Sequence, residues 1–137
     1  MSSSLDSNEP VRLGIAGLGL AGAMLIRAAR IDPRFDLVAG MDPLARPRET
    51  FREEFGARVY EDFAALCQDD TVEAIYISSP HEYHTEQAIA ALEQGKHVLV
   101  EKPLALTLAD CDRVIDAAER ADTHLIVGHT HGFDPNI

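Results

Sequence analysis

Three glycines near the N-terminus follow the spacing G-x-G-x-x-G, at Gly17, Gly19 and Gly22. In this pattern the first glycine permits a tight turn, the second lets a diphosphate approach the main chain, and the third lets a helix lie close to a strand. The N–H groups at the start of that helix offer partial positive charge to the phosphates. We therefore expect a dinucleotide to contact Gly17, Leu18, Gly19, Leu20, Ala21 and Gly22.

An acidic residue follows this turn at the distance typical of dinucleotide-binding proteins. Asp42 lies 20 residues after Gly22, where a carboxylate can accept hydrogen bonds from the ribose hydroxyls. A carboxylate there repels a 2′-phosphate, so NAD is favoured over NADP, although Arg46 and Arg48 lie close by in sequence. Two alternatives stay open. Asp42 with Pro43 can simply begin a turn, and methyltransferases also combine a glycine-rich loop with a later acidic residue.

The glycine turn needs a strand before it and a helix after it, and the apolar pattern predicts both. Strands are expected over residues 11–16, 35–41, 58–60, 73–78, 97–100 and 124–128. Helices are expected over 20–31, 47–55 and 84–94, after a cap at Asp62, and from Thr107 to about Ala121. Short connections in such an alternation require parallel strands, and right-handed crossovers place helices on both faces. The sequence thus predicts an α/β, doubly wound Rossmann fold with strand order 3-2-1-4-5-6.

Two further segments are expected at the same edge of the sheet. The strand order reverses between the first and fourth strands, so the loops that follow these strands leave a crevice. The loop of residues 78–84 follows the fourth strand and faces the glycine turn across this crevice. The fifth strand ends in Glu101-Lys102-Pro103 at the same edge. Both segments are therefore candidates for contact with the nicotinamide end, although Lys102 can also be a solvated lysine at a strand end.

These segments resemble a known family. The pattern Ser79-Pro80-x-x-x-His84 and the run Gly-Lys-His-Val-Leu-Val-Glu-Lys-Pro-Leu at residues 95–104 are similar to the glucose–fructose oxidoreductase, inositol dehydrogenase and rhizopine-catabolism (Gfo/Idh/MocA) family. The resemblance extends from about Val11 to the C-terminus. It implies an N-terminal Rossmann domain that binds NAD or NADP, and a second α+β domain for substrate binding and oligomerisation. It also implies oxidation or reduction of hydroxyl and carbonyl groups on sugars, cyclitols and dihydrodiols.

The resemblance also implies roles for individual residues. Lys102 is the catalytic lysine, whose ammonium hydrogen-bonds the substrate oxygen and stabilises charge that develops there during hydride transfer. Glu101 orients the nicotinamide end, and a cis peptide bond before Pro103 aims the lysine. His84 matches a histidine near the cofactor, while its alternative is a histidine packed at a helix start. The implied cofactor contacts in these segments are Ser79, Pro80, His84, Glu101 and Lys102.

The last residues carry two histidines and depart from the family pattern. Gly132 stands where an arginine is usual, and the pattern Gly-His-Thr-His-x-Phe-Asp is similar to the subgroup that dehydrogenates phthalate dihydrodiols. His129 and His131 point to one side of a strand, but a third metal ligand is not evident, so no metal is expected. Cys67 and Cys111 fit no metal-ligand spacing and are expected as small buried hydrophobic residues.

Length and charge limit the remaining choices. The chain has 137 residues, with 12 Lys and Arg against 23 Asp and Glu, a net charge of −11. Such a surface repels nucleic acid, and no apolar run reaches the roughly 18 residues of a membrane span. We expect a cytoplasmic protein with a disordered leader (1–9), the dinucleotide-binding domain (10–130) and the start of the crossover to a substrate domain absent from this chain (131–137). The whole protein is then a homo-oligomeric dehydrogenase of a small molecule, and this chain alone is inactive. The alternative is a non-enzymatic NAD-sensing module.

Overall fold

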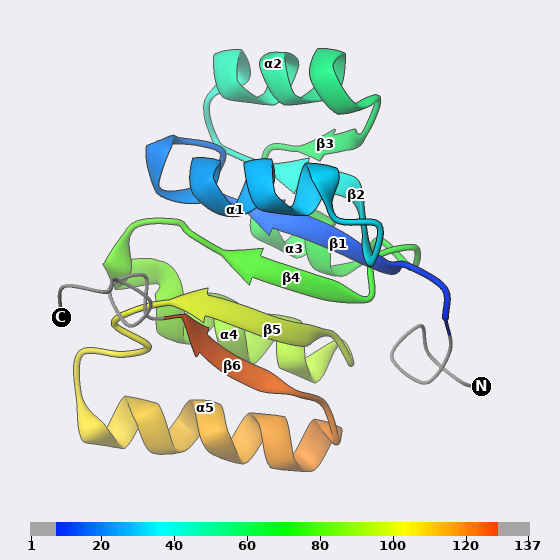
Figure 1. The fold of residues 1–137 in the computed structure, drawn as a ribbon. Coiled ribbons are helices and arrows are strands. Elements are labelled where there is room, and N and C mark those ends of the chain that lie inside the picture. Colours follow the sequence, from blue (N-terminus) through cyan, green and yellow to red (C-terminus); the bar gives the residue numbers. More distant parts are fainter. Residues whose placement is uncertain (1–7, 129–137) are drawn as a thin grey trace, which may run out of the picture.

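Within residues 8–128, which the computed structural model describes, six parallel strands form one sheet in the order β3-β2-β1-β4-β5-β6 (Figure 1). Every neighbouring pair in this sheet is parallel. The strands are β1 (Val11–Ala16), β2 (Phe35–Met41), β3 (Arg58–Tyr60), β4 (Ala74–Ile77), β5 (His97–Glu101) and β6 (Leu125–Gly128). The doubly wound Rossmann fold and its strand order, both expected from the sequence, are confirmed.

Helices cover both faces of this sheet, as predicted. They are α1 (Leu20–Ile31), α2 (Ala45–Phe55), α3 (Phe63–Cys67), the 3₁₀ turn η2 (His81–Tyr83), α4 (His84–Glu93) and α5 (Leu108–Ala121). Figure 1 shows α1 in front of the sheet, with α3 and α4 behind it. The helices α1 and α2 pack on β2 and its neighbours, whereas α4 packs on β4, β5 and α5.

The core consists of two apolar clusters, one on each face, because successive residues of a strand point to opposite sides. In β4 the side chains of Ile75 and Ile77 lie in the cluster that α3, α4 and α5 cover. Tyr76, between them, lies in the cluster that α1 and α2 cover, together with Ile15 and Phe51. This alternation determines toward which face of the sheet each side chain near the carboxyl edge points.

The sequence predicted two helix caps that the structure confirms. The Asp62 carboxylate accepts a hydrogen bond from the main-chain N–H of Ala65 at 2.8 Å, and the Thr107 hydroxyl accepts one from Asp110 at 3.1 Å. The start of α2 was predicted wrongly, at residue 47. The helix begins at Ala45 and contains Pro47 in its first turn, where a proline is tolerated because the N–H groups there have no partner within the helix. The other bounds differ by at most one residue.

Burial was expected for both cysteines and is confirmed for one. Cys67 is buried in the core, whereas Cys111 is only half-buried. Burial raises the pKa of the Cys67 thiol to about 11, with a smaller opposing effect from Lys96. A reactive thiolate at Cys67 is therefore disfavoured. Among the described helices, none is both long and apolar enough to cross a membrane.

Candidate functional site

The glycine turn joins β1 to α1 in a conformation that requires glycine at its first position. Gly17 has φ +93°, and a Cβ there would lie 2.8 Å from the main chain of Ser78 and Ser79. Its N–H donates to the carbonyl of Met41 at 2.8 Å, which ties the turn to the end of β2. The tight turn expected at Gly17 is thus present, between the ends of β2 and β4.

The other two glycines have different surroundings, and the difference suits a diphosphate. A Cβ at Gly22 would lie 2.8 Å from the Ser78 Oγ and 2.9 Å from the Gly17 carbonyl, so this glycine lets α1 lie close to β4. A Cβ at Gly19 would meet nothing within 4 Å. Gly19 is the N-cap of α1, and among the described residues no side chain caps that helix. The Gly22 N–H donates to the Gly19 carbonyl at 3.3 Å, so the N–H groups that precede it in this turn are the ones that can meet an external anion.

Asp42 supports the glycine turn directly. Its Oδ2 accepts a hydrogen bond from the Leu18 N–H at 3.0 Å, and its Oδ1 accepts one from the Leu44 N–H at 2.9 Å. The Arg48 guanidinium donates to the Asp42 carbonyl at 2.8 Å. Asp42 therefore begins a turn, as the alternative interpretation held. Because each carboxylate oxygen has a second lone pair, the residue can accept ribose hydroxyls as well.

Ser78 is a supporting residue that the sequence did not single out. Its hydroxyl lies 2.8 Å from the carbonyl of Gly17 and 3.1 Å from that of Ala16, and its N–H donates to Ala16 at 2.8 Å. Through these hydrogen bonds Ser78 connects the end of β4 to the glycine turn. The available signal was its place directly after a buried strand on the crevice.

The loop after β4 is held by hydrogen bonds of its own. The Ser79 hydroxyl donates to the Gln87 side chain, and exposed Pro80 leads into η2. His84 is fully buried, with Nε2 2.7 Å from the Ser79 carbonyl and Nδ1 2.9 Å from the Pro103 carbonyl. Its ring is thus packed at a helix start, as its alternative interpretation held, and it connects this loop to the segment after β5.

The segment after β5 carries the candidate catalytic lysine. Glu101 is the last residue of β5 and accepts a hydrogen bond from the Tyr76 hydroxyl. Lys102 is exposed, and the Lys102–Pro103 peptide bond is cis, as expected from the sequence. Register places the ends of β1, β4 and β5 side by side. The glycine turn, Asp42, the loop after β4 and residues 101–103 therefore meet at one edge of the sheet.

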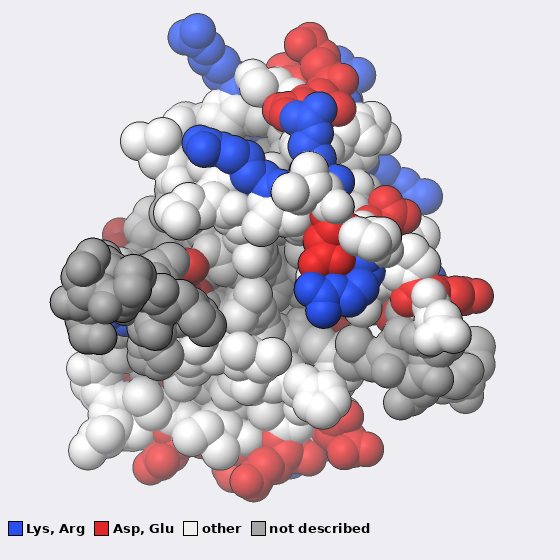
Figure 2. Space-filling view, viewed as in Figure 1, with Lys and Arg blue, Asp and Glu red and all other residues white. Residues whose placement is uncertain are grey.

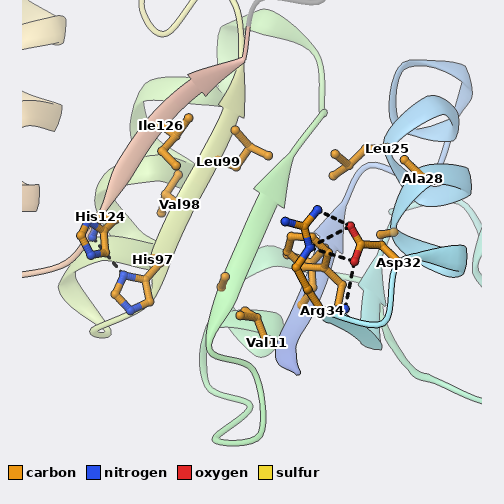
Figure 3. Close-up of a pocket in the computed structure, with 14 residues that line it drawn as sticks. Val11, Leu25, Ala28, Asp32, Arg34, His97, Val98, Leu99, His124 and Ile126 are labelled. Carbon is orange, nitrogen blue, oxygen red and sulfur yellow. Dashed lines mark hydrogen bonds and ion pairs between the residues drawn. The ribbon is translucent and has the colours of Figure 1, made fainter. Parts of the chain in front are cut away.

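A separate apolar hollow of about 460 Å³ lies away from this edge, on the face that carries α1. Figure 3 shows Leu25 and Ala28 of α1 facing Leu99 and Ile126 of β5 and β6 across it. The space-filling view shows uncharged side chains over much of the middle of this face, with acidic and basic groups beside and around them (Figure 2), and the Asp32–Arg34 ion pair lines the hollow at one side. This surface is suited to packing rather than to a polar ligand.

No metal site is evident in the part of the chain that the structure describes. Among residues 8–128, no three His, Cys, Asp or Glu side chains gather in a way that could hold a metal ion. His129, His131, Gly132 and the expected crossover at 131–137 lie outside the described residues, as does most of the expected leader at 1–9.

The parallel sheet with a glycine turn at its switch point defines a dinucleotide-binding domain of the Rossmann type. Residues 11–129 match the Gfo/Idh/MocA oxidoreductase family, which has an NAD-binding Rossmann fold. The chain belongs to this family. Membership decides against the methyltransferase alternative.

Similar proteins place the chain within the family. It is 44% identical over 128 residues to a 1-carboxy-3-chloro-3,4-dihydroxycyclohexa-1,5-diene dehydrogenase of Comamonas testosteroni, covering 93% of this chain and 32% of that one. A Synechocystis biliverdin reductase, solved with biliverdin and NADP⁺, has 34% identity and a TM-score of 0.82, covering 88% and 38%. The Bordetella pertussis WlbA dehydrogenase, solved with NADH and UDP-GlcNAcA, has 26% identity and a TM-score of 0.84, covering 89% and 36%. The chain thus spans about a third of the length of these relatives.

Proposed function

We propose that this chain is the cofactor-binding domain of a dehydrogenase that moves a hydride between a nicotinamide and a hydroxyl or carbonyl group of a small molecule. The observation that carries the proposal is the convergence at one sheet edge of the open N-terminus of α1, Asp42 and residues 101–103. Gly19 presents no side chain where the diphosphate would lie, and the uncapped helix supplies N–H donors. The residues present thus fit a dinucleotide.

Lys102 is the residue that we assign to the reaction. When bound, the nicotinamide accepts or donates the hydride. An ammonium at Lys102 donates a hydrogen bond to the reacting oxygen and stabilises the negative charge that develops on it. The exposed position of Lys102 at the carboxyl end of β5 supports this role, because ligands bind at that end of parallel strands. Glu101 beside it orients the nicotinamide end of the cofactor.

The cofactor that we propose is NAD rather than NADP. Asp42 is only 9% exposed, and hydrogen bonds to Leu18 and Leu44 hold its carboxylate in place at the end of β2. A fixed negative charge beside the ribose repels a 2′-phosphate. Two nearby cations oppose this preference, Arg46, exposed in the first turn of α2, and Arg48, whose guanidinium donates to the Asp42 carbonyl.

The substrate class that we propose is a cyclic diol, with a cis-dihydrodiol such as a phthalate dihydrodiol ahead of sugars and cyclitols. The 44% identity to the Comamonas testosteroni dihydrodiene dehydrogenase supports this order. Two relatives were solved with quite different molecules, biliverdin and UDP-GlcNAcA, which supports substrate groups that come from outside the cofactor domain. The test is reduction of NAD⁺ by dihydrodiol, inositol and sugar probes in a longer polypeptide that carries this chain.

The apolar hollow supports a second domain. Its lining is mostly apolar, with the Asp32–Arg34 ion pair at one side, and a largely apolar surface of this size is normally buried against another part of a protein. We propose that further chain, in a protein of the relatives' length, packs against Leu25, Leu99 and Ile126 and contributes the substrate site and the oligomer contacts. This chain alone then binds the cofactor but turns over poorly, because the substrate is neither positioned nor shielded from water.

The direct test of the proposal is calorimetric titration of the 137-residue chain with NADH, NADPH and S-adenosylmethionine. We expect saturable binding of NADH, weaker binding of NADPH and none of S-adenosylmethionine. Binding of S-adenosylmethionine alone would contradict the assignment of a nicotinamide cofactor. Tighter binding of NADPH than of NADH would overturn the role of Asp42 in cofactor choice.

A further inference from the structure

The position of the Lys102 ammonium depends on how firmly its main chain is held. A lysine side chain has a flexible four-carbon stem. Lys102 itself is exposed, whereas Glu101 before it and Pro103 after it are half-buried. A hydrogen bond from a buried side chain reaches each of these two neighbours, so the turn of residues 101–103 is held on both sides of the lysine.

The first of these contacts comes from Tyr76 in the middle of β4. Its side chain is 2% exposed and lies in the apolar cluster on the face that carries α1. The hydroxyl donates to the Glu101 Oε1. Burial, and then the Glu101 carboxylate, raise the pKa of Tyr76, so its phenol keeps the hydrogen that it donates. Glu101 is thereby held from the α1 side of the sheet.

The second contact comes from His84, at the start of α4 on the opposite face. The ring is 0% exposed, with Nδ1 2.9 Å from the Pro103 carbonyl and Nε2 2.7 Å from the Ser79 carbonyl. Carbonyl oxygens only accept hydrogen bonds, and a neutral imidazole has a single N–H, whereas an imidazolium has two. The two distances direct both ring nitrogens at the main chain rather than at an external ligand, and the ring donates to both carbonyls as an imidazolium or to one of them as a neutral imidazole.

On the basis of the function proposed above, we propose that Tyr76 and His84 are positioning residues of Lys102. They hold the turn of residues 101–103 against the loop after β4, Tyr76 through Glu101 and His84 through Pro103. Neither side chain touches the reacting atoms in this arrangement. This differs from the direct cofactor contact that the sequence implied for His84, because the buried ring acts through the two loops that it joins.

A matched pair of variants separates the two contacts of His84. The amide nitrogen of asparagine takes the place of Nδ1, and that of glutamine takes the place of Nε2. His84→Asn thus keeps the donor to Pro103, whereas His84→Gln keeps only the donor to Ser79. A role limited to packing the start of α4 would instead make the smaller asparagine the more disruptive of the two. Tyr76→Phe removes the other contact and leaves the ring of the side chain in the core.

The readout is the ¹⁵N order parameter of the Glu101 and Lys102 amides in the 137-residue chain. We expect a rigid value of about 0.85 in the unchanged chain and in His84→Asn, and less than about 0.6 in His84→Gln and Tyr76→Phe. Equal values in the two His84 variants, or a rigid turn in Tyr76→Phe, would overturn the inference. Calorimetry with NAD⁺ on the unchanged chain distinguishes this result from a failure of the proposed function, which predicts binding. In a longer, active polypeptide, His84→Gln should lower kcat about a hundredfold with the KM for NAD⁺ unchanged.

Discussion

Substitution of Gly19 by valine isolates the role of the glycine turn, because the fold tolerates a side chain there. Gly19 has φ −83° and ψ −161°, which any residue adopts, and a Cβ would meet nothing within 4 Å. The valine side chain instead occupies the space in which the diphosphate would lie. We therefore expect Gly19→Val to fold as the unchanged chain does and to lose affinity for NADH.

The magnitude follows from the hydrogen bonds that the diphosphate loses. Each hydrogen bond to a charged group contributes about 1.5–3 kcal/mol. Loss of two such bonds at the start of α1 raises the dissociation constant at least about a hundredfold, since 1.4 kcal/mol corresponds to about tenfold. Isothermal titration with NADH measures this loss, and a thermal melt checks that the fold is intact.

Gly56 provides the matched control. It ends α2 with φ +62°, far in sequence from the turn, and a Cβ there would also meet nothing within 4 Å. Gly56→Ala places a side chain in the left-handed region and costs about 1 kcal/mol of stability. We expect a lower melting temperature with unchanged NADH affinity, the reverse of Gly19→Val. If Gly19→Val bound NADH as tightly as Gly56→Ala, the diphosphate would not lie on this turn.

Three further outcomes follow from the structure. Asp42→Ala removes the acceptor of two main-chain N–H groups, so the free energy of unfolding, measured by chemical denaturation, should fall by about 1–3 kcal/mol. The preference for NADH over NADPH should also disappear, and a retained preference would refute the role of the carboxylate. Burial raises the pKa of Cys67 to about 11, so its thiolate is scarce below that pH. A disulfide reagent at pH 8 should therefore label Cys111 first in the native chain, and faster labelling of Cys67 would contradict its burial. Ile126 is 59% exposed, so Ile126→Asp should be tolerated in this chain. In a longer polypeptide in which the hollow is covered, the same substitution should lower the melting temperature. Equal effects in both would argue against packing of further chain on the hollow.

The strand order and the glycine turn could be predicted from sequence because both depend on local signals. A buried strand, three glycines and an apolar helical face follow one another within about one βαβ unit. The bounds of α1 agree with the prediction of residues 20–31. The start of α2 was missed because Pro47 was placed at the first position of the helix, whereas the structure accommodates it two residues further along.

The contacts that hold the candidate site could not be predicted in the same way. Tyr76 reaches Glu101 because β4 and β5 are neighbours in register, and His84 reaches Pro103 across two loops. Such pairs are separated by 25 and 19 residues in sequence, so no local pattern joins them. The sequence offered packing at a helix start as one interpretation of His84, but the contacts of its ring with two carbonyls required the tertiary structure.

A crystal structure of the chain with NAD⁺ tests the proposed cofactor site most directly. We expect diphosphate oxygens within hydrogen-bond distance of the N–H groups that begin α1, and a ribose hydroxyl on the Asp42 carboxylate. The nicotinamide should lie beside Lys102. A cofactor bound in the apolar hollow beside Leu25, or a diphosphate remote from Gly19, would contradict the assignment of this sheet edge as the cofactor site.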